Sequence, residues 1–328
     1  MKTFIFILLA SLFVSNAFVQ QPAEESPELK EATELTKSVA KLFNEQKFDE
    51  ALALAKRSLE IRERLLPRTD PRVGQSLAHV GDLYIAKHDY DSARKIFERL
   101  LAIQEERFGP DDVNLAFVFD RLAVLYNRDG KPAKTEEFYQ RALAVREKAF
   151  GPEHVEVAET LYALGQFYRI RREYTRAHDS YKRSLLIYGR TGGVTSTEYN
   201  RANTGLSCLG YETGNKAIFK ELEDIQQQFA PGLPMAPPKS ILNGLALTLA
   251  KPEYPLAARN MGLRGSVVVN VELDETGKVI SAKDVCQGLP FLSESALRAA
   301  LKSRFSPTKI SGVPVKTTGV IVYNFLQR

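Results

Sequence analysis

The sequence has few of the side chains that enzymes use at a reactive centre. It contains four histidines and two cysteines in 328 residues, and no metal-ligand or redox spacing joins them. It also has no glycine-rich phosphate loop after an expected strand and no nucleophile elbow. Acid pairs such as Glu105-Glu106 fall on expected helices, where solvated surface is the simplest interpretation. We therefore expect no enzyme activity, no metal site, no cofactor and no small-molecule substrate.

An excess of one charge is also missing. The 45 basic and 40 acidic residues give a net charge of +5, and the two signs are interleaved rather than gathered into the basic stripe of a nucleic-acid binder. Nucleic acid is therefore not an expected partner. Hydrophobic residues make up 44% and charged residues 26% of the chain, which is ordinary for a soluble globular protein. The length predicts about two domains.

Long apolar runs are absent except at the start of the chain. There, Lys2 precedes an apolar run of 11 residues from Phe4 to Val14, shorter than the ~20 residues that a membrane-spanning helix needs. Small residues in Ser15-Asn16-Ala17 complete a secretory signal peptide, residues 1–17, with cleavage expected after Ala17. The alternative is a retained membrane anchor, which would be the chain's one contact with a membrane. No cysteine lies near the cut, so a lipid anchor is unsupported.

The two cysteines stand far apart in the sequence. Cys208 and Cys286 are 78 residues apart and fall in different expected domains. In an oxidising compartment they could form a disulfide. We favour the interpretation that both are buried thiols that behave as small hydrophobic residues.

An internal repeat of 42 residues runs through much of the chain. Basic, aliphatic and aromatic residues recur at this period. They include Arg57, Arg99, Arg141 and Arg183; Ile61, Ile103, Val145 and Ile187; and Leu42, Tyr84, Tyr126 and Tyr168. Apolar spacings of three and four predict two helices in each repeat, and Gly109-Pro110 and Gly151-Pro152 end the second helix in two of them. Because one helix pair cannot bury its apolar face alone, we expect neighbouring pairs to stack into a solenoid.

These repeats resemble the tetratricopeptide repeat in the 42-residue form of kinesin light chains. The matching residues are Val80-Gly81 with Tyr84, Ala93 and Phe97, and Leu164-Gly165 with Tyr168, Ala177 and Tyr181. The resemblance implies an all-α solenoid over residues 28–229, including a looser capping pair of helices near 196–211 and 215–229. It also implies a concave surface that binds a peptide or protein. Its positions would be Asp82, Asp120, Asn127, Tyr162, Gln166 and Arg169. The alternative is that these are simply solvated helix residues.

The composition changes after the last repeat. Five prolines and glycines crowd residues 230–239, which predicts a short, stiff linker. Beyond it, alternating apolar residues predict strands at Ser266–Leu273 and Val279–Val285, joined by a tight turn at Asp274–Gly277. A helix capped by Ser293 and a final strand at Val315–Leu326 follow. We therefore expect residues 240–328 to form a small α+β domain, a three-stranded antiparallel sheet with two helices on one face.

This second domain resembles the C-terminal domain of TonB. The matching segments are Pro252-Glu253-Tyr254-Pro255, Gly265-Ser266-Val267-Val268-Val269, Gly277-Lys278-Val279 and Arg304-Phe305-Ser306-Pro307. One departure is Ser303, where many members of the family have tryptophan. The resemblance implies that a partner peptide pairs with an exposed sheet edge, which we place on the last strand. The edge residues would be Val315, Thr317, Gly319, Ile321, Tyr323 and Phe325. The alternative is an edge covered by a neighbouring chain or loop.

The two resemblances together imply a multidomain envelope protein with protein or peptide partners. Three functions fit. The first, which we favour, is a periplasmic adaptor whose repeats bind one protein and whose TonB-like domain binds another. The second is a TonB-type energy transducer for uptake through outer-membrane receptors, which would need a retained inner-membrane anchor. The third is a structural protein that docks to peptidoglycan or to other chains.

Overall fold

The computed structural model describes residues 26–232, 239, 241–242, 245–260, 264–286 and 290–326. The expected signal peptide and most of the proline-rich linker lie outside these residues. The chain divides into two compact units, Met1–Ile96 and Phe97–Arg328. Within the part of the chain that the structure describes, every helix is too short or too polar to traverse a lipid bilayer.

The first unit consists of repeat helices. They are α1 (Pro27–Asn44), α2 (Phe48–Leu65), α3 (Pro71–Ala86) and the first turns of α4 (Tyr90–Phe108). Ser26 and Asp70 begin α1 and α3, because each side chain accepts a hydrogen bond from a backbone N–H in the first turn. A proline follows each cap at the first helical position, where its missing N–H costs nothing.

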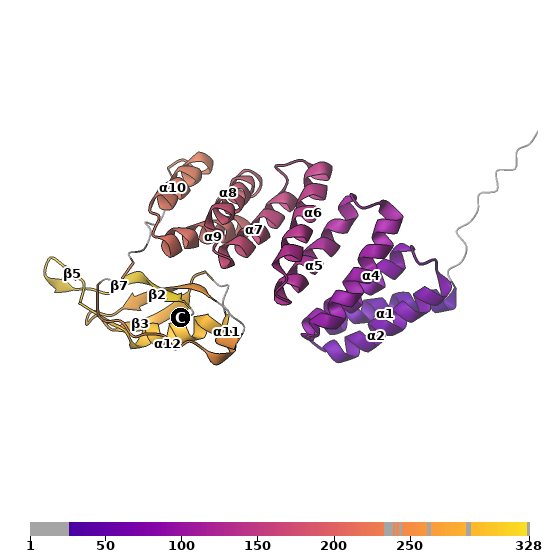
Figure 1. Ribbon diagram of the computed structural model, residues 1–328, viewed down its shortest axis with the longest axis horizontal. Coiled ribbons are helices and arrows are strands. Elements are labelled where there is room, and N and C mark those ends of the chain that lie inside the picture. The colour runs from indigo at the N-terminus through magenta and orange to yellow at the C-terminus, as the bar shows by residue number, and fades with distance from the viewer. Residues whose placement is uncertain are drawn as a thin grey trace, which may run out of the picture. The chain divides into compact units, whose positions relative to one another are not determined.

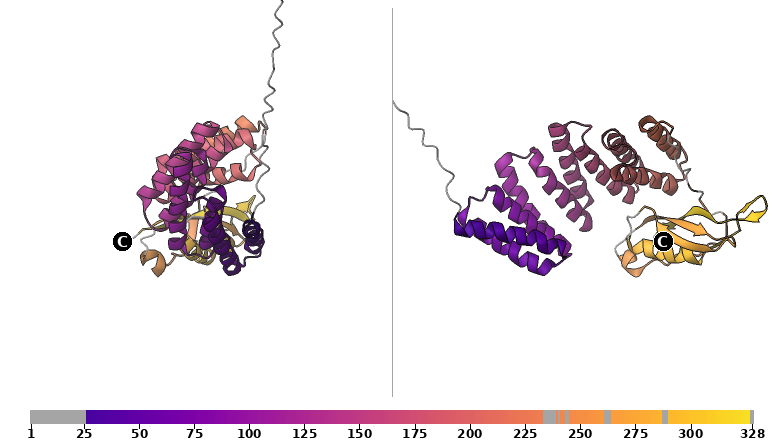
Figure 2. Two further views of the ribbon diagram at one scale, coloured as in Figure 1. Left: turned by 90° about the vertical axis from the view of Figure 1, so that its right-hand side faces the viewer. Right: turned by 180° about the vertical axis from the view of Figure 1, so that it is seen from behind.

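The second unit continues the series of helix pairs. It holds a short 3-10 helix (Val113–Leu115), α5 (Ala116–Arg128), α6 (Pro132–Phe150), α7 (Val155–Ile170), α8 (Tyr174–Thr191), α9 (Thr197–Thr213) and α10 (Ala217–Phe229). Figure 1 shows these helices pairing one after another, and Figure 2 shows the same pairs from two other sides. The predicted solenoid is confirmed, including its additional pair, α9 and α10. Gly109 and Gly151 end their helices with positive φ angles of 82° and 86°, as glycine readily does.

The C-terminal part of the second unit is the predicted α+β domain. Its sheet has the order β3-β2-β7, with β2 (Gly265–Leu273) antiparallel to both β3 (Val279–Asp284) and β7 (Thr317–Phe325). Two helices accompany the sheet, α11 (Leu256–Asn260) and α12 (Pro290–Lys302). Two short strand pairs are additional. They join β1 (Ala246–Thr248) to β4 (Arg304–Phe305), and β5 (Lys309–Ile310) to β6 (Val313–Pro314).

The turn between β2 and β3 requires glycine. Gly277 has a φ of +80°, and a Cβ atom there would lie 1.9 Å from the carbonyl oxygen of Phe305. Phe305 N–H in turn donates to the Gly277 carbonyl at 2.9 Å. The predicted tight turn is therefore also the point where the end of α12 is tied to the sheet.

Two predicted boundaries in this domain are wrong. The helix α12 begins at Pro290, so Ser293 lies inside it and donates to the Asp284 carboxylate rather than capping the helix. The final strand begins at Thr317, because the preceding residues form the hairpin of β5 and β6 around Ser311 and Gly312, which have positive φ angles.

The two faces of the sheet pack against different elements. Alternate residues of β2, such as Val269 and Val271, join the core formed with α12. The intervening Val268 packs with Val320 of β7 and with Tyr211 of α9. A repeat helix therefore covers one face of the C-terminal sheet, and the domain's own helix covers the other.

Candidate partner-binding surfaces

The β7 strand forms one edge of the sheet. Val320 of this strand accepts a hydrogen bond from Leu242 N–H at 2.8 Å, so its carbonyl points away from β2. Since both backbone polar groups of a strand residue point to the same side and neighbours alternate, the outward-facing set also contains Thr318 and Asn324. The predicted Thr317, Gly319, Ile321, Tyr323 and Phe325 are the alternate set, whose backbone polar groups face β2.

The side chains of the predicted edge residues belong mostly to the core. Ile321, Tyr323 and Phe325 are buried against α12 and its neighbours. The Tyr323 hydroxyl lies 3.3 Å from the hydroxyl of Ser303. Val315 lies outside β7, where its N–H donates to the carbonyl of Thr308. The edge therefore offers a partner backbone groups rather than a row of side chains.

A segment of the chain itself lies along this edge. Ile241 bridges Val320 in parallel, and Leu242 is only 7% exposed. Leu242 packs over Gly319, where an added Cβ atom would lie 2.6 Å from the leucine side chain. At Val320 the structure thus shows the alternative considered above, an edge covered by another part of the chain.

The six predicted groove residues lie on the first helix of their pairs. Asp82 is on α3 in the first unit, Asp120 and Asn127 are on α5, and Tyr162, Gln166 and Arg169 are on α7. Within the second unit, Asp120 forms an ion pair with Arg146 at 2.7 Å. Burial raises the pKa of the Asp120 carboxyl, and Arg146 opposes that shift. Asp120 thus balances a buried arginine, whereas Asn127 is exposed.

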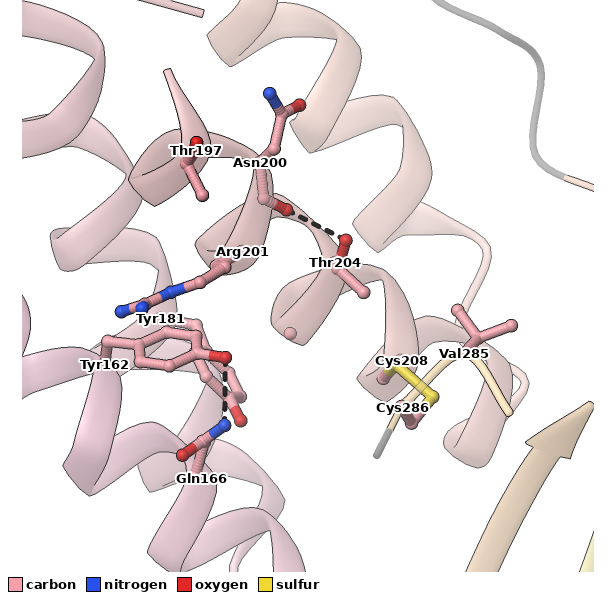
Figure 3. A pocket seen from close by; sticks show the side chains of 11 residues that line it. Tyr162, Gln166, Tyr181, Thr197, Asn200, Arg201, Thr204, Cys208, Val285 and Cys286 are labelled. Atoms are coloured by element: carbon pink, nitrogen blue, oxygen red, sulfur yellow. Dashed lines mark hydrogen bonds between the residues drawn. A yellow bond between two sulfur atoms is a disulfide. The ribbon is translucent and has the colours of Figure 1, made fainter. Parts of the chain in front are cut away.

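Tyr162 and Gln166 come together in a polar pocket of about 510 Å³ (Figure 3). Gln166 donates to the Tyr162 hydroxyl at 2.9 Å. The guanidinium of Arg201, on α9, lies 4.8 Å from the centre of the Tyr162 ring, within the range of a cation–π interaction. Asn200, Thr197 and Thr204 add further polar atoms to the lining. Arg201 gives this pocket a positively charged group.

Arg169 does not line this pocket. Its side chain is 5% exposed, and its guanidinium bonds the carboxylate of Glu212, whose side chain is 4% exposed, and the carbonyl of Cys286 at 2.9 Å. Burial opposes and Glu212 favours the charged arginine, and the net effect raises the pKa of Arg169. Arg169 therefore joins α7 and α9 to the loop that follows β3, instead of facing an open groove.

The cysteines also belong to this junction. Cys208 of α9 and Cys286, just after β3, form a disulfide that borders the polar pocket (Figure 3). The favoured interpretation as separate buried thiols is wrong, because packing of α9 on the sheet brings the two residues to a Cα–Cα distance of 5.8 Å. The signal that could have found the pair was an expected exported chain with two cysteines. Nothing in the sequence pattern pointed to Tyr211 or Leu242.

The residues matched by two family models correspond to these parts of the structure. The tetratricopeptide repeat matches residues 39–106, 72–134 and 112–189, and the Gram-negative bacterial TonB protein C-terminal matches residues 250–326. The chain carries tetratricopeptide repeats and a TonB C-terminal domain. The β3-β2-β7 sheet with α12 is this TonB domain, and the helix pairs that precede it contain the repeats.

Proteins of known structure or function resemble one part or the other. The nearly identical TPR-like repeats of a kinesin light chain protein from Podosopora anserina align over 63% of this chain and 100% of theirs, at 15% identity and a TM-score of 0.53. BtubC from P. vanneervenii aligns over 65% of this chain and 96% of its own, at 17% identity and a TM-score of 0.51. Both show a shared repeat fold.

The curated relative resembles the other end of the chain. Protein TonB of Vibrio cholerae is 38% identical over 66 residues, which are 20% of this chain and 27% of that protein. The chain thus spans about a quarter of the length of the curated relative that it matches. The similarity supports the assignment of the TonB domain, and the activity of the whole relative enters only as a proposal.

Proposed function

We propose that this protein is a periplasmic adaptor that holds two protein partners, one on its repeats and one on the edge of its TonB domain. Repeats of this kind indicate protein–protein interaction. The observation that carries the proposal is the hydrogen bond from Leu242 N–H to the Val320 carbonyl, because it is formed by a segment outside the three-stranded sheet. An extended peptide would pair with β7 through the same kind of bond.

The geometry supports weak and reversible pairing with a peptide. Each hydrogen bond adds only about 1 kcal/mol in net terms, because bonds to water are lost when it forms. A few bonds along Thr318–Asn324 would therefore give modest affinity. A second partner on the repeats, with an acidic group near Arg201, would raise the overall affinity of an assembly that engages both surfaces.

A TonB-type energy transducer is the second candidate. The similarity to Protein TonB of Vibrio cholerae favours it. A transducer needs an attachment to the inner membrane, and residues 1–17 would have to stay uncleaved to provide it. The two functions therefore differ in the mature N-terminus and in the fraction where the protein is found.

The first test is fractionation of cells that express the native chain, with intact mass of the purified protein. A soluble periplasmic protein that begins near Phe18 supports the adaptor. A chain that still begins at Met1 and needs detergent for extraction supports the transducer.

The second test addresses the edge itself. A photo-reactive amino acid at Thr318, an exposed residue of β7, should cross-link to a protein partner in cells. The matched control is the same group at Glu294, an exposed residue of α12. Equal cross-linking at both positions, or none at Thr318, would argue against pairing at the β7 edge.

A further inference from the structure

The segment that covers β7 is held by several independent contacts. Ile241 bridges Val320 in parallel, and Leu242 N–H donates to the Val320 carbonyl at 2.8 Å. Just upstream, Lys239 N–H donates to the Tyr211 hydroxyl of α9 at 2.9 Å, and Lys239 Nζ donates to Asn270 Oδ1 of β2 at 2.6 Å. The segment is thus tied to the sheet and to the last repeat helices at once.

Gly319 leaves space above the strand for one side chain of this segment. Three atoms of the Leu242 side chain would lie within 2.9 Å of a Cβ atom built on Gly319. The leucine instead uses the empty position and joins the core cluster that includes Ile321 and Val271. The neighbouring Ile241 is 42% exposed. Of these two side chains, only that of Leu242 is therefore buried over the strand.

We propose that the segment at Lys239 and Ile241–Leu242 occupies the edge of the TonB domain with which a partner peptide would pair. A partner then binds only by displacing this segment. The partner would be an extended peptide that places a leucine-like aliphatic side chain over Gly319. This inference rests on the proposed pairing at β7 and adds its regulation. Self-occupation lowers the apparent affinity for any partner by the fraction of molecules whose edge is free.

The test compares two alanine variants of the full-length chain. The probe is a fluorescent synthetic peptide with the sequence of residues 239–245. Leu242→Ala weakens the packing of the segment on β7, so the peptide should bind this variant about tenfold more tightly than the wild type. Ile241→Ala removes an exposed side chain of similar size next to it and should leave the affinity unchanged. Adding Gly319→Val to Leu242→Ala fills the space above residue 319 and should abolish binding of the peptide.

Amide hydrogen exchange gives a readout that does not depend on a variant's stability. In the wild type the Leu242 amide should exchange slowly, because it is bonded to Val320. Exchange as fast as that of an unstructured peptide would overturn the proposal. Equal affinity of Leu242→Ala and the wild type, or no binding of the peptide to either, would overturn it as well.

The outcomes separate this inference from the proposed function. Cross-linking to a partner at Thr318 that is equally strong in the wild type and in Leu242→Ala would leave the adaptor standing and remove the self-occupied edge. A large gain in peptide affinity for Leu242→Ala without any partner at Thr318 would support the self-occupied edge and argue against the adaptor.

Discussion

The repeat helices and the junction with the TonB domain are held together by different kinds of contact. In the repeats, Arg62 donates to Ser76 at 2.8 Å and Arg146 donates to Thr160 at 2.6 Å, and the acceptor is 14 positions after the donor in both cases. The two arginines are two repeat lengths apart, and Gln104 occupies the equivalent position between them. The junction has no such counterpart, since the positions equivalent to Arg169 are Asn127 and Ile85.

This difference shows how a repeat array acquires a specific attachment. The arginine contact recurs two repeats along the chain and stabilises the stack, because in both places it joins neighbouring helices in the same way. Arg169 breaks the period and bonds Glu212 and the Cys286 carbonyl. Tyr211 similarly leaves the repeat core to pack on Val268 and Val320. These two departures from the period lie where the solenoid contacts the TonB domain.

The largest expected effect comes from breaking the buried pair at the junction. Arg169→Met removes one charge and leaves Glu212 buried without its partner. Such a loss costs about 3–5 kcal/mol, because the remaining charge is desolvated and uncompensated. Chemical denaturation of the full-length protein measures the change in the free energy of unfolding.

Two further variants control this prediction. Arg171→Met removes an exposed partner of Glu173, and a surface pair of this kind is worth about 1 kcal/mol or less. Adding Glu212→Leu to Arg169→Met should recover much of the lost stability, since no buried charge then remains. If Arg169→Met costs no more than Arg171→Met, the pair does not hold the junction.

Removal of the disulfide should have the next largest effect. Replacing both Cys208 and Cys286 by serine should lower the free energy of unfolding by about 2–4 kcal/mol, because the unfolded chain is no longer cross-linked over 78 residues. Amide exchange at Val268, beneath α9, should become faster. The wild type treated with a reductant should match the double variant, and the variant should not respond to the reductant. If the stability of the wild type is equally insensitive to the reductant, the assignment of the disulfide is contradicted.

The sequence predicted the parts of the structure that follow a local rule. The 42-residue period located the helix pairs, and alternation of apolar residues in β2 located the sheet and its buried face. It did not predict the junction, because Cys208 and Cys286 meet only after two domains have packed. The same reason explains why Arg169 was expected in an open groove and the last strand at an open edge. Contacts made once in a fold leave no periodic signal.

A third prediction tests a contact inside the repeats. Gly165→Ala should lower the free energy of unfolding by about 1–3 kcal/mol, because the new Cβ atom would lie 2.6 Å from the ring of Tyr181, which is fully buried. The loss is expected although alanine favours a helix over glycine by about 1 kcal/mol. Thermal or chemical unfolding measures it. Adding Tyr181→Leu should make alanine at 165 less harmful than in the wild type. An unchanged penalty would show that the tyrosine ring is not the obstacle.

The smallest effect concerns His79, which breaks the period away from the junction, since Arg121 and Ala163 occupy the equivalent positions. Burial lowers the pKa of His79 below its usual 6.5, nearby Arg62 adds to the shift and Asp82 opposes it. The unfolded chain therefore binds a proton more readily than the folded one. The contribution of His79 is complete above about pH 6.5 and is lost as the pH falls through the folded pKa.

The measurement is the melting temperature of the wild type and of His79→Gln between pH 7.5 and pH 5. The wild type should lose more stability on acidification than His79→Gln. Amide exchange at the junction of α9 with the TonB domain should be the same in both proteins. An equal loss of melting temperature in both proteins would show that His79 does not cause the pH dependence. A different exchange rate at Val268 would show that a departure from the period outside the junction still affects the junction. The expected result instead confines this departure to its own helix pair, so a broken period marks an attachment only where another domain packs against it.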